Sequence, residues 1–166
     1  MSIFFPKFKK TLIPTMMKKI SLPIRFGLVT SAVLIAYFLI LSLFNKHINP
    51  AFSFFNALIT GFGVYEAVKL SKLQFPTSFS YGQGFKTGII TGFVATFVFT
   101  IFFLFYSTEV NTNFLPELLQ TFKGKFDVNI GMITFIVAVM GLATSVVATL
   151  SVMQLFKNSR NIPQNL

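Results

Sequence analysis

The chain has 166 residues, of which 54% are hydrophobic and only 11% are charged, and its mean hydropathy is +0.74. A water-soluble domain of this size needs more polar surface than this composition supplies, so that class is excluded. The net charge of +10 does not indicate a nucleic-acid partner, because the basic residues flank apolar segments. The composition predicts an all-α polytopic membrane protein.

The first 22 residues form a basic leader in which five lysines are mixed with large apolar side chains. Such a segment can lie at the membrane interface, with its lysines against anionic lipid headgroups. Pro6 and Pro14 would limit it to short helical pieces. The simpler alternative is a leader that only orients the first span.

Four apolar runs without a charged residue follow the leader, at residues 26–45, 48–65, 87–108 and 128–156. A helix needs about 20 apolar residues to cross about 30 Å of hydrocarbon. The runs do not alternate with polar residues, and so few strands could not close a barrel in lipid. We therefore predict a four-helix transmembrane domain over residues 23–157, with spans at about 24–44, 51–70, 87–106 and 130–156.

The three connections between these spans differ in character. The first, at 45–50, is short and predicts a tight antiparallel hairpin, and the second, at 71–83, is a polar connector. The third is an outer loop at 107–129, where apolar residues recur at helical spacing around Pro116 and predict a short amphipathic helix. Residues 158–166 form a polar tail.

The distribution of basic residues orients the spans. Eleven Lys and Arg residues lie in the leader, beside the second connection and after the fourth span, whereas three lie in the first and third connections. Because Lys and Arg are retained on the cytoplasmic side, this bias predicts that both termini are cytoplasmic.

Residues 25–33 and 86–94 resemble each other, with three identical and four similar positions. Both segments open a span that leaves the cytoplasm, so the two hairpins would be parallel repeats about an axis normal to the membrane. The second and fourth spans show no such match, and apolar helices with basic starts resemble each other easily. Duplication and chance similarity both stay open.

Small residues recur at every fourth position on the third and fourth spans. The members of these two stripes include Gly84, Gly88, Gly92 and Thr96 on the third span, and Gly141 and Ser145 on the fourth. Helices in lipid associate through close packing, which small side chains permit. The stripes therefore predict helix packing, either inside one chain or between two copies.

Glu66 is the one carboxylate inside a predicted span. An ionisable group in the membrane is a candidate functional residue, because hydrocarbon disfavours its charged form. Glu66 lies three residues before Lys69 and near the end of its span, so it can pair with that lysine or reach the headgroups. A structural role is the simpler interpretation, and a proton relay is the alternative.

No motif for catalysis stands out. The sequence has no cysteine, a single histidine (His47) that cannot form a metal site by itself, and no nucleophile–histidine–acid set or phosphate-binding loop. We expect no enzymatic activity, no cofactor and no metal.

A more specific pattern lies between the second and third spans. Tyr65 and Lys69 close the second span, and the run Phe-Ser-Tyr-Gly-Gln-Gly-Phe-Lys-Thr-Gly at 79–88 opens the third. With four spans in a chain of this length, this pattern resembles the Bacteroidota membrane family catalogued as domain of unknown function 4199. The resemblance implies a bacterial inner membrane protein without an assigned activity, so it carries over no catalytic or binding residues.

These patterns leave two functional hypotheses. The first is a non-catalytic accessory or scaffold subunit that packs against other membrane helices, either a second copy or another membrane protein. The alternative is a small transporter or channel component that acts as an oligomer. A water-filled cavity reaching Glu66 would favour the transporter, and a dry interior with an exposed small-residue stripe would favour the scaffold.

Overall fold

The computed structural model describes residues 21–47, 49–121 and 128–157. It contains four long helices, α2 (Leu22–Leu43), α3 (Pro50–Gln74), α4 (Tyr81–Phe105) and α6 (Ile130–Leu155). A π-helical turn, η1 (Tyr106–Val110), and a short helix, α5 (Phe114–Thr121), connect α4 to α6. Over these residues the chain is all-α, as predicted. Nearly all of the basic leader and the C-terminal tail at 158–166 lie outside the described residues.

Each of the four long helices is long and apolar enough to cross a membrane. The chain is therefore an integral, polytopic membrane protein. The bounds of α2 and α6 differ from the predicted spans by two residues or fewer, whereas α3 and α4 both extend into the segment predicted as a connector. Only residues 75–80 connect these two helices.

The early start of α4 has a local cause. The Ser80 side chain accepts a hydrogen bond from the Gln83 backbone N–H at 3.3 Å, and the Gln83 side chain accepts one from the Ser80 backbone N–H at 3.2 Å. This reciprocal capping box satisfies two N–H groups that a helix start leaves free. α4 consequently begins at Tyr81, six residues before the predicted start of the span at 87.

The tight hairpin between α2 and α3 also follows from its sequence. Asn45 adopts a left-handed conformation with φ +52°, which asparagine tolerates better than most residues. The Asn45 N–H then donates to the Ser42 carbonyl at 3.0 Å and the Lys46 N–H to the Leu41 carbonyl at 2.9 Å. These two bonds form a Schellman motif that ends α2. Asn49 caps the start of α3 by accepting from the Ala51 N–H.

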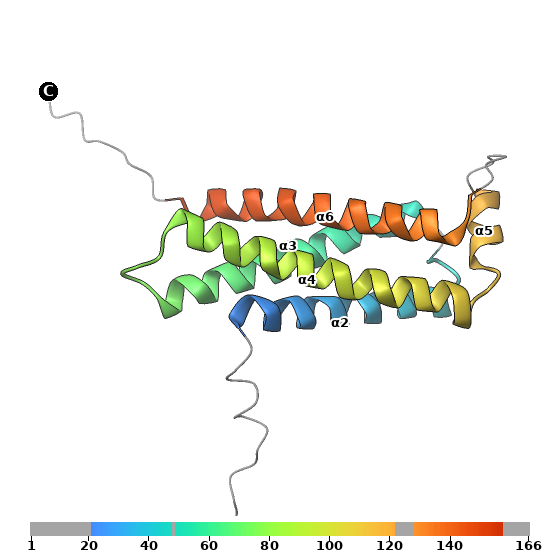
Figure 1. Cartoon of the computed structure of the whole chain (residues 1–166), viewed down its shortest axis with the longest axis horizontal. Helices are drawn as coiled ribbons and strands as arrows, with labels where there is room; N and C mark the ends of the chain where they lie inside the picture. The colour runs from blue at the N-terminus through green and yellow to red at the C-terminus, as the bar shows by residue number, and fades with distance from the viewer. Residues whose placement is uncertain (1–20, 48, 122–127, 158–166) are drawn as a thin grey trace, which may run out of the picture.

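The four long helices alternate in direction and lie side by side (Figure 1). α4 packs against the other three, and α6 packs against α4 and α3. We call the end where residues 75–80 join α3 to α4 the connector end, and the opposite end, which α5 crosses, the α5 end (Figure 1). The halves of the molecule toward these ends are the connector half and the α5 half.

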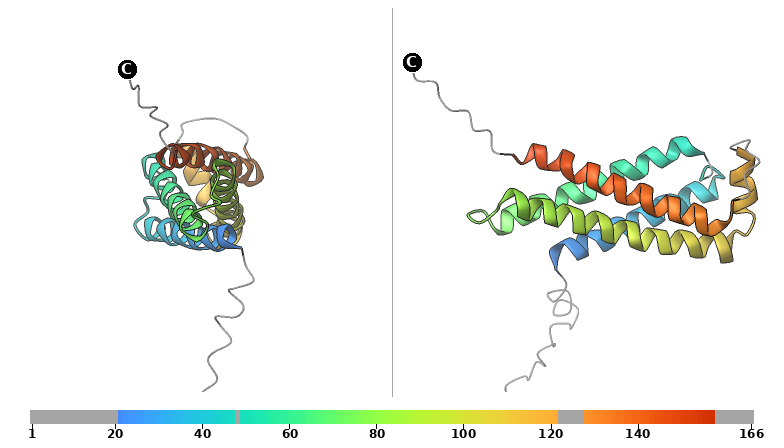
Figure 2. Two further views of the ribbon diagram at one scale, coloured as in Figure 1. Left: turned by 90° about the vertical axis from the view of Figure 1, so that its left-hand side faces the viewer. Right: turned by 45° about the horizontal axis from the view of Figure 1, so that its top comes forward.

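The helix packing bears on the internal repeat. If a two-fold axis related the α2–α3 hairpin to the α4–α6 hairpin, the contact between α3 and α4 would have an equal counterpart between α2 and α6. In the end-on view of Figure 2 the long helices lie along the sides of a square, with α3 opposite α4 and α2 opposite α6. Of these two opposite pairs, only α3 and α4 pack together extensively. The packing is therefore not two-fold symmetric, and the similarity of 25–33 to 86–94 stays an observation on the sequence.

Candidate functional site

The small-residue stripe of α4 faces α6. A Cβ atom built on Gly88 would lie 2.6 Å from Thr149 Cγ2, and one built on Gly92 would lie 2.5 Å from Ser145 Cβ. Real Cβ atoms do not approach so closely, so the two backbones are near each other only because these positions are glycine. At the connector end, a Cβ on Gly84 would meet Met153 in the same way.

The stripe of α6 completes this contact near the middle of the helices. A Cβ on Gly141 would lie 2.5 Å from Thr96 Cγ2. The Thr96 and Ser145 hydroxyls are hydrogen-bonded to each other at 3.2 Å, and Ser145 is fully buried. The residues predicted to mediate helix packing therefore come together between α4 and α6 of one chain.

Glu66 lies on α3 in the connector half. Its carboxylate accepts a hydrogen bond from Lys69 Nζ at 3.4 Å, and both side chains are partly exposed. Lys69 Nζ also lies 5.6 Å from the centroid of the Tyr65 ring. The structure thus places Glu66 in a local pair with Lys69, away from the other sequence-predicted residues.

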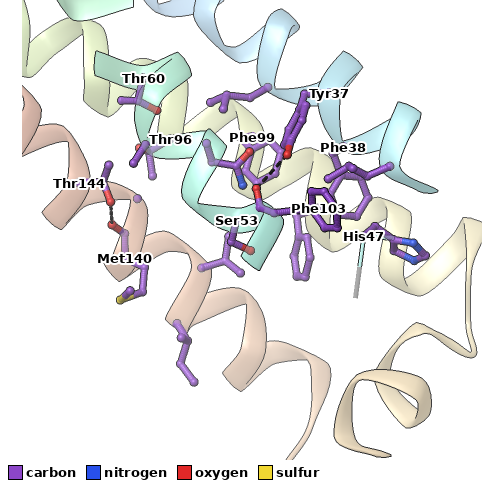
Figure 3. Close-up of a pocket in the computed structure, with 18 of the residues that line it drawn as sticks. Tyr37, Phe38, His47, Ser53, Thr60, Thr96, Phe99, Phe103, Met140 and Thr144 are labelled. Atoms are coloured by element: carbon purple, nitrogen blue, oxygen red, sulfur yellow. Dashed lines mark hydrogen bonds between the residues drawn. The ribbon is translucent and has the colours of Figure 1, made fainter. Parts of the chain in front are cut away.

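A cavity of about 520 Å³ occupies the α5 half, where α2, α3, α4 and α6 meet under α5 (Figure 3). Thr60 and Thr96 lie at one end of this cavity and His47 at the other (Figure 3). Most of its wall is apolar, and it includes the aromatic and aliphatic side chains Leu34, Phe38, Phe99, Phe103, Phe114, Leu118, Ile133 and Val137. Glu66 does not contribute to the wall.

The cavity has a lateral opening. Three of its lining residues are themselves exposed, and these are Ser53 on α3 and Ile136 and Met140 on α6. Because α2, α4 and α5 contribute no exposed residue to the wall, the opening lies between α3 and α6. In a membrane this opening faces the hydrocarbon of the bilayer.

A polar face of α3 lines one side of the cavity. Ser53, Asn56 and Thr60 follow one another at spacings of three and four residues, so they lie on one side of the helix. Thr144 on α6 and Thr96 on α4 also line the cavity. The Asn56 Oδ1 atom is buried and has no hydrogen-bond partner within the described part of the chain.

His47 lies at the α5 end of the cavity among aromatic rings. Its imidazole stacks on the Phe114 ring at a centroid distance of 5.4 Å and meets the Phe38 ring edge-on at 5.7 Å. Both ring nitrogens are buried without a hydrogen-bond partner among the described residues. Burial lowers the pKa of His47 below its ordinary value, and the nearby charge of Glu117 acts in the opposite direction.

This cavity was not predicted from the sequence. The pattern that could have predicted it is the spacing of three and four residues between Ser53, Asn56 and Thr60, which lie on the least apolar of the four spans. The three residues occupy only the first half of α3, so they do not form the polar path through a whole span that a transport route would require. Only the folded structure shows that they face a cavity.

The cavity suits the binding of an uncharged molecule. Among the described residues, no Asp, Glu, Lys or Arg contributes to its wall, and the same residues contain no group of three or more metal-ligating side chains. What the wall supplies is apolar surface and the hydrogen-bonding groups of Tyr37, His47, Ser53, Asn56 and the nearby threonines.

No curated protein and no solved structure matches the chain. A family model described as "Protein of unknown function (DUF4199)" matches residues 25–132. The match runs from the first turns of α2 through α3, α4 and α5 to the beginning of α6. It covers more than half of the chain and includes the run at 79–88 that carried the resemblance. The chain therefore belongs to this family.

Proposed function

We propose that this integral membrane protein is a non-catalytic accessory subunit that packs against a helix of another membrane protein. The observation that supports this function most directly is the outer face of α2. Ala32 and Ala36 lie one turn apart and are exposed, whereas Gly27 and Ser31 are buried. Small side chains one turn apart permit close approach of a second helix in lipid.

Larger side chains border this pair of alanines. Val29, Val33 and Ile40 lie on the same side of α2 and have exposed fractions of 62%, 47% and 53%. A partner helix would fit its own side chains over the alanines and between these ridges, gaining contacts along about three turns.

The connector half supports an accessory role over transport. Val64, Val68 and Met153 are buried there with exposed fractions of 0%, 0% and 1%. The close glycine contacts join α4 to α6 in the same half, so a passage would require these helices to separate. The cavity ends before Glu66, so the alternative of a transporter or channel component gains no support from it.

For localisation we propose the bacterial inner membrane, with both termini in the cytoplasm. Five of the six described Lys and Arg residues lie toward the connector end, namely Arg25, Lys69, Lys72, Lys86 and Lys157, and Lys46 lies at the α5 end. This charge difference favours a cytoplasmic connector end.

Cysteine labelling tests this orientation, because the chain has no native cysteine. In intact cells, a membrane-impermeant thiol reagent should label Asn113→Cys and leave Ser78→Cys unlabelled until the membrane is permeabilised. Labelling of Ser78→Cys in intact cells would reverse the assignment.

Affinity purification of the full chain from its native membrane in mild detergent tests the accessory role. The wild-type protein should retain a membrane partner that Ala36→Phe loses, because the phenyl ring prevents close approach on α2. Ala143→Phe is the matched control, since Ala143 is exposed on α6. Equal recovery of the partner by both variants would contradict the α2 interface, and absence of any stoichiometric partner would contradict the accessory role.

A further inference from the structure

The cavity in the α5 half has the features of a binding site. Its volume of about 520 Å³ falls within the range of about 300–1,000 Å³ that is usual for small-molecule pockets. Cavities that stay empty in proteins are lined by apolar groups alone. This one has a row of polar side chains along α3, which requires a different explanation.

The unpaired atoms in the wall indicate what a ligand must offer. Asn56 Oδ1 is a buried acceptor without a partner among the described residues. A buried polar group of this kind is costly unless it forms a hydrogen bond. The carboxamide group of Asn56 has both an acceptor and donors, so a ligand group that donates and accepts, such as a hydroxyl or an amide, pairs with it in either orientation of the side chain.

Charge narrows the ligand further. Since no Asp, Glu, Lys or Arg in the described part of the chain lines the cavity, an ionised head group would be buried there without a counter-ion from these residues, which is strongly unfavourable. His47 does not supply that counter-ion at neutral pH, because burial lowers its pKa and keeps the imidazole uncharged. The ligand is therefore uncharged.

The opening between α3 and α6 indicates where the ligand comes from. Ile136 and Met140 border this opening and are exposed at 48% and 63%, on a helix face that meets the bilayer. A molecule entering there comes from the hydrocarbon layer and not from water. It must be soluble in the bilayer and narrow enough to pass between two helices.

We propose that the cavity binds a single-chain, uncharged lipid whose hydroxyl or amide head group is hydrogen-bonded to Asn56. Its hydrocarbon chain lies against the phenylalanine rings of α2 and α4, of which Phe38 and Phe103 are buried. This site is separate from the α2 face at Ala32 and Ala36, so its test does not depend on a protein partner.

The test uses the full chain in phosphatidylcholine vesicles and three photoactivatable probes with the same diazirine-bearing hydrocarbon chain. These probes are a long-chain alcohol, its methyl ether, which cannot donate a hydrogen bond, and a phosphatidylcholine. Cross-linked positions are mapped by mass spectrometry. The alcohol should label residues 53–60 of α3 and 133–144 of α6 saturably, and label them about fivefold more efficiently than the ether, as expected for the loss of one hydrogen bond.

Three variants separate the cavity from general lipid contact. Ala57→Phe fills the cavity and should remove saturable labelling, whereas Ala143→Phe, on the outer face of α6, should leave it unchanged. Asn56→Leu removes the polar partner and keeps a similar side-chain volume. The alcohol and the ether should label this variant equally. If Ala57→Phe fails to fold, the labelling efficiency of the alcohol relative to the ether, measured on Asn56→Leu, still decides the role of Asn56.

Each contrary result has a definite meaning. Labelling that never saturates and follows exposure along outward residues such as Phe54 and Phe97 would show ordinary lipid contact and overturn the site. Equal labelling of the wild-type cavity by alcohol and ether would overturn the hydrogen bond to Asn56. Saturable labelling of the cavity by the phosphatidylcholine probe in preference to the alcohol would overturn the single-chain class.

Discussion

The helices pack differently in the two halves of the molecule, through glycines in the connector half and through aromatic rings in the α5 half, and α4 takes part in both. In the connector half, Gly88 and Gly92 bring the α4 backbone close to α6, with Thr149 and Ser145 filling the narrow space. In the α5 half, α4 presents rings such as Phe103 toward the centre. Rings hold helices farther apart than glycines do, and the space left between them is the cavity.

α3 shows the same contrast within a single helix. Val64, Ala67 and Val68 in its second half have exposed fractions of zero. In its first half, Phe54 and Leu58 are exposed at 67% and 53%. The second half of α3 packs against α6, where Val64 and Val68 form one buried cluster with Val152 and Met153, and the two helices diverge toward the α5 end (Figure 2). The first half of α3 is therefore the least firmly packed wall of the cavity.

Contacts between rings take the place of close backbone packing in the α5 half. The Phe38 ring meets Phe99, Phe102, Phe103 and Tyr106 edge-on at centroid distances of 5.0–6.1 Å. Edge-on pairs of aromatic rings contribute about 0.5–1.5 kcal/mol each beyond their buried area. Such a cluster closes the α5 end firmly while it leaves open space deeper in the same half.

The largest effect should come from enlarging a glycine in the connector half. Gly92→Leu forces a branched side chain against Ser145, and overpacking of this kind usually costs about 1–3 kcal/mol of the free energy of unfolding. The matched control is Gly61→Leu, because no atom of the described residues beyond its own helix neighbourhood lies within 4 Å of a Cβ built on Gly61. That substitution should be neutral or stabilise by up to about 1 kcal/mol, since leucine favours a helix more than glycine does.

Thermal unfolding and protease resistance in detergent would compare these two glycine variants with Phe97→Leu, whose ring is exposed at 68% on the outer face of α4. If Gly92→Leu were tolerated as well as Phe97→Leu, the stripe of α4 would face lipid and the packing described here would be incorrect.

A second pair of variants tests the contrast along α3 itself. Ala57→Leu adds a side chain into the cavity and should stabilise the protein by about 0.5–2 kcal/mol, because it fills empty space with new contacts. Ala67→Leu adds the same atoms where the exposed fraction is zero, and it should cost about 1–3 kcal/mol. Unfolding midpoints measured in one detergent give both values. A loss of stability with Ala57→Leu would indicate that the space next to Ala57 is already filled.

The fold was largely predictable because it depends on local features of the sequence. Apolar runs of sufficient length predicted four spans, and each is present within the described residues. The short first connection also predicted the tight hairpin that Asn45 and Asn49 form. The start of α4 was misplaced because residues 71–83 were predicted as a polar connector and the span was begun at the charge-free run from residue 87, although Ser80 and Gln83 already formed a capping-box pattern.

The candidate site was less predictable, since a cavity depends on which side chains meet across different helices. Every-fourth spacing identified the stripe of Gly88 and Gly92, but it did not distinguish a contact within the chain from one between copies. The cavity arises because rings from α2, α4 and α5 gather around Phe38, and these rings are distant in sequence. No pattern within one span contains that information.

A smaller effect should follow from His47, which belongs to the α5 half. Its pKa in the folded protein is lowered by burial, so the unfolded chain binds more protons as the pH falls through its ordinary value of about 6.5. Stability should therefore decrease as the pH falls below about 7, with the loss complete below the folded-state pKa. His47→Phe keeps an aromatic ring at this position and should remove that part of the pH dependence. An unchanged slope in thermal unfolding would show that His47 is not the group that titrates.

The smallest effect should come from Glu66, which lies in the connector half and does not line the cavity. Its pair with Lys69 at 3.4 Å is partly exposed, and such pairs contribute about 0.5 kcal/mol or less. Glu66→Gln keeps the shape and an acceptor for Lys69, so the variant should remain in the membrane with almost unchanged thermal unfolding. A proton relay predicts a different result, in which the variant folds normally but fails to complement a deletion strain that shows a phenotype. That outcome would make Glu66 functional and would require a water path through the connector half, where Val64 and Val68 now close the interior.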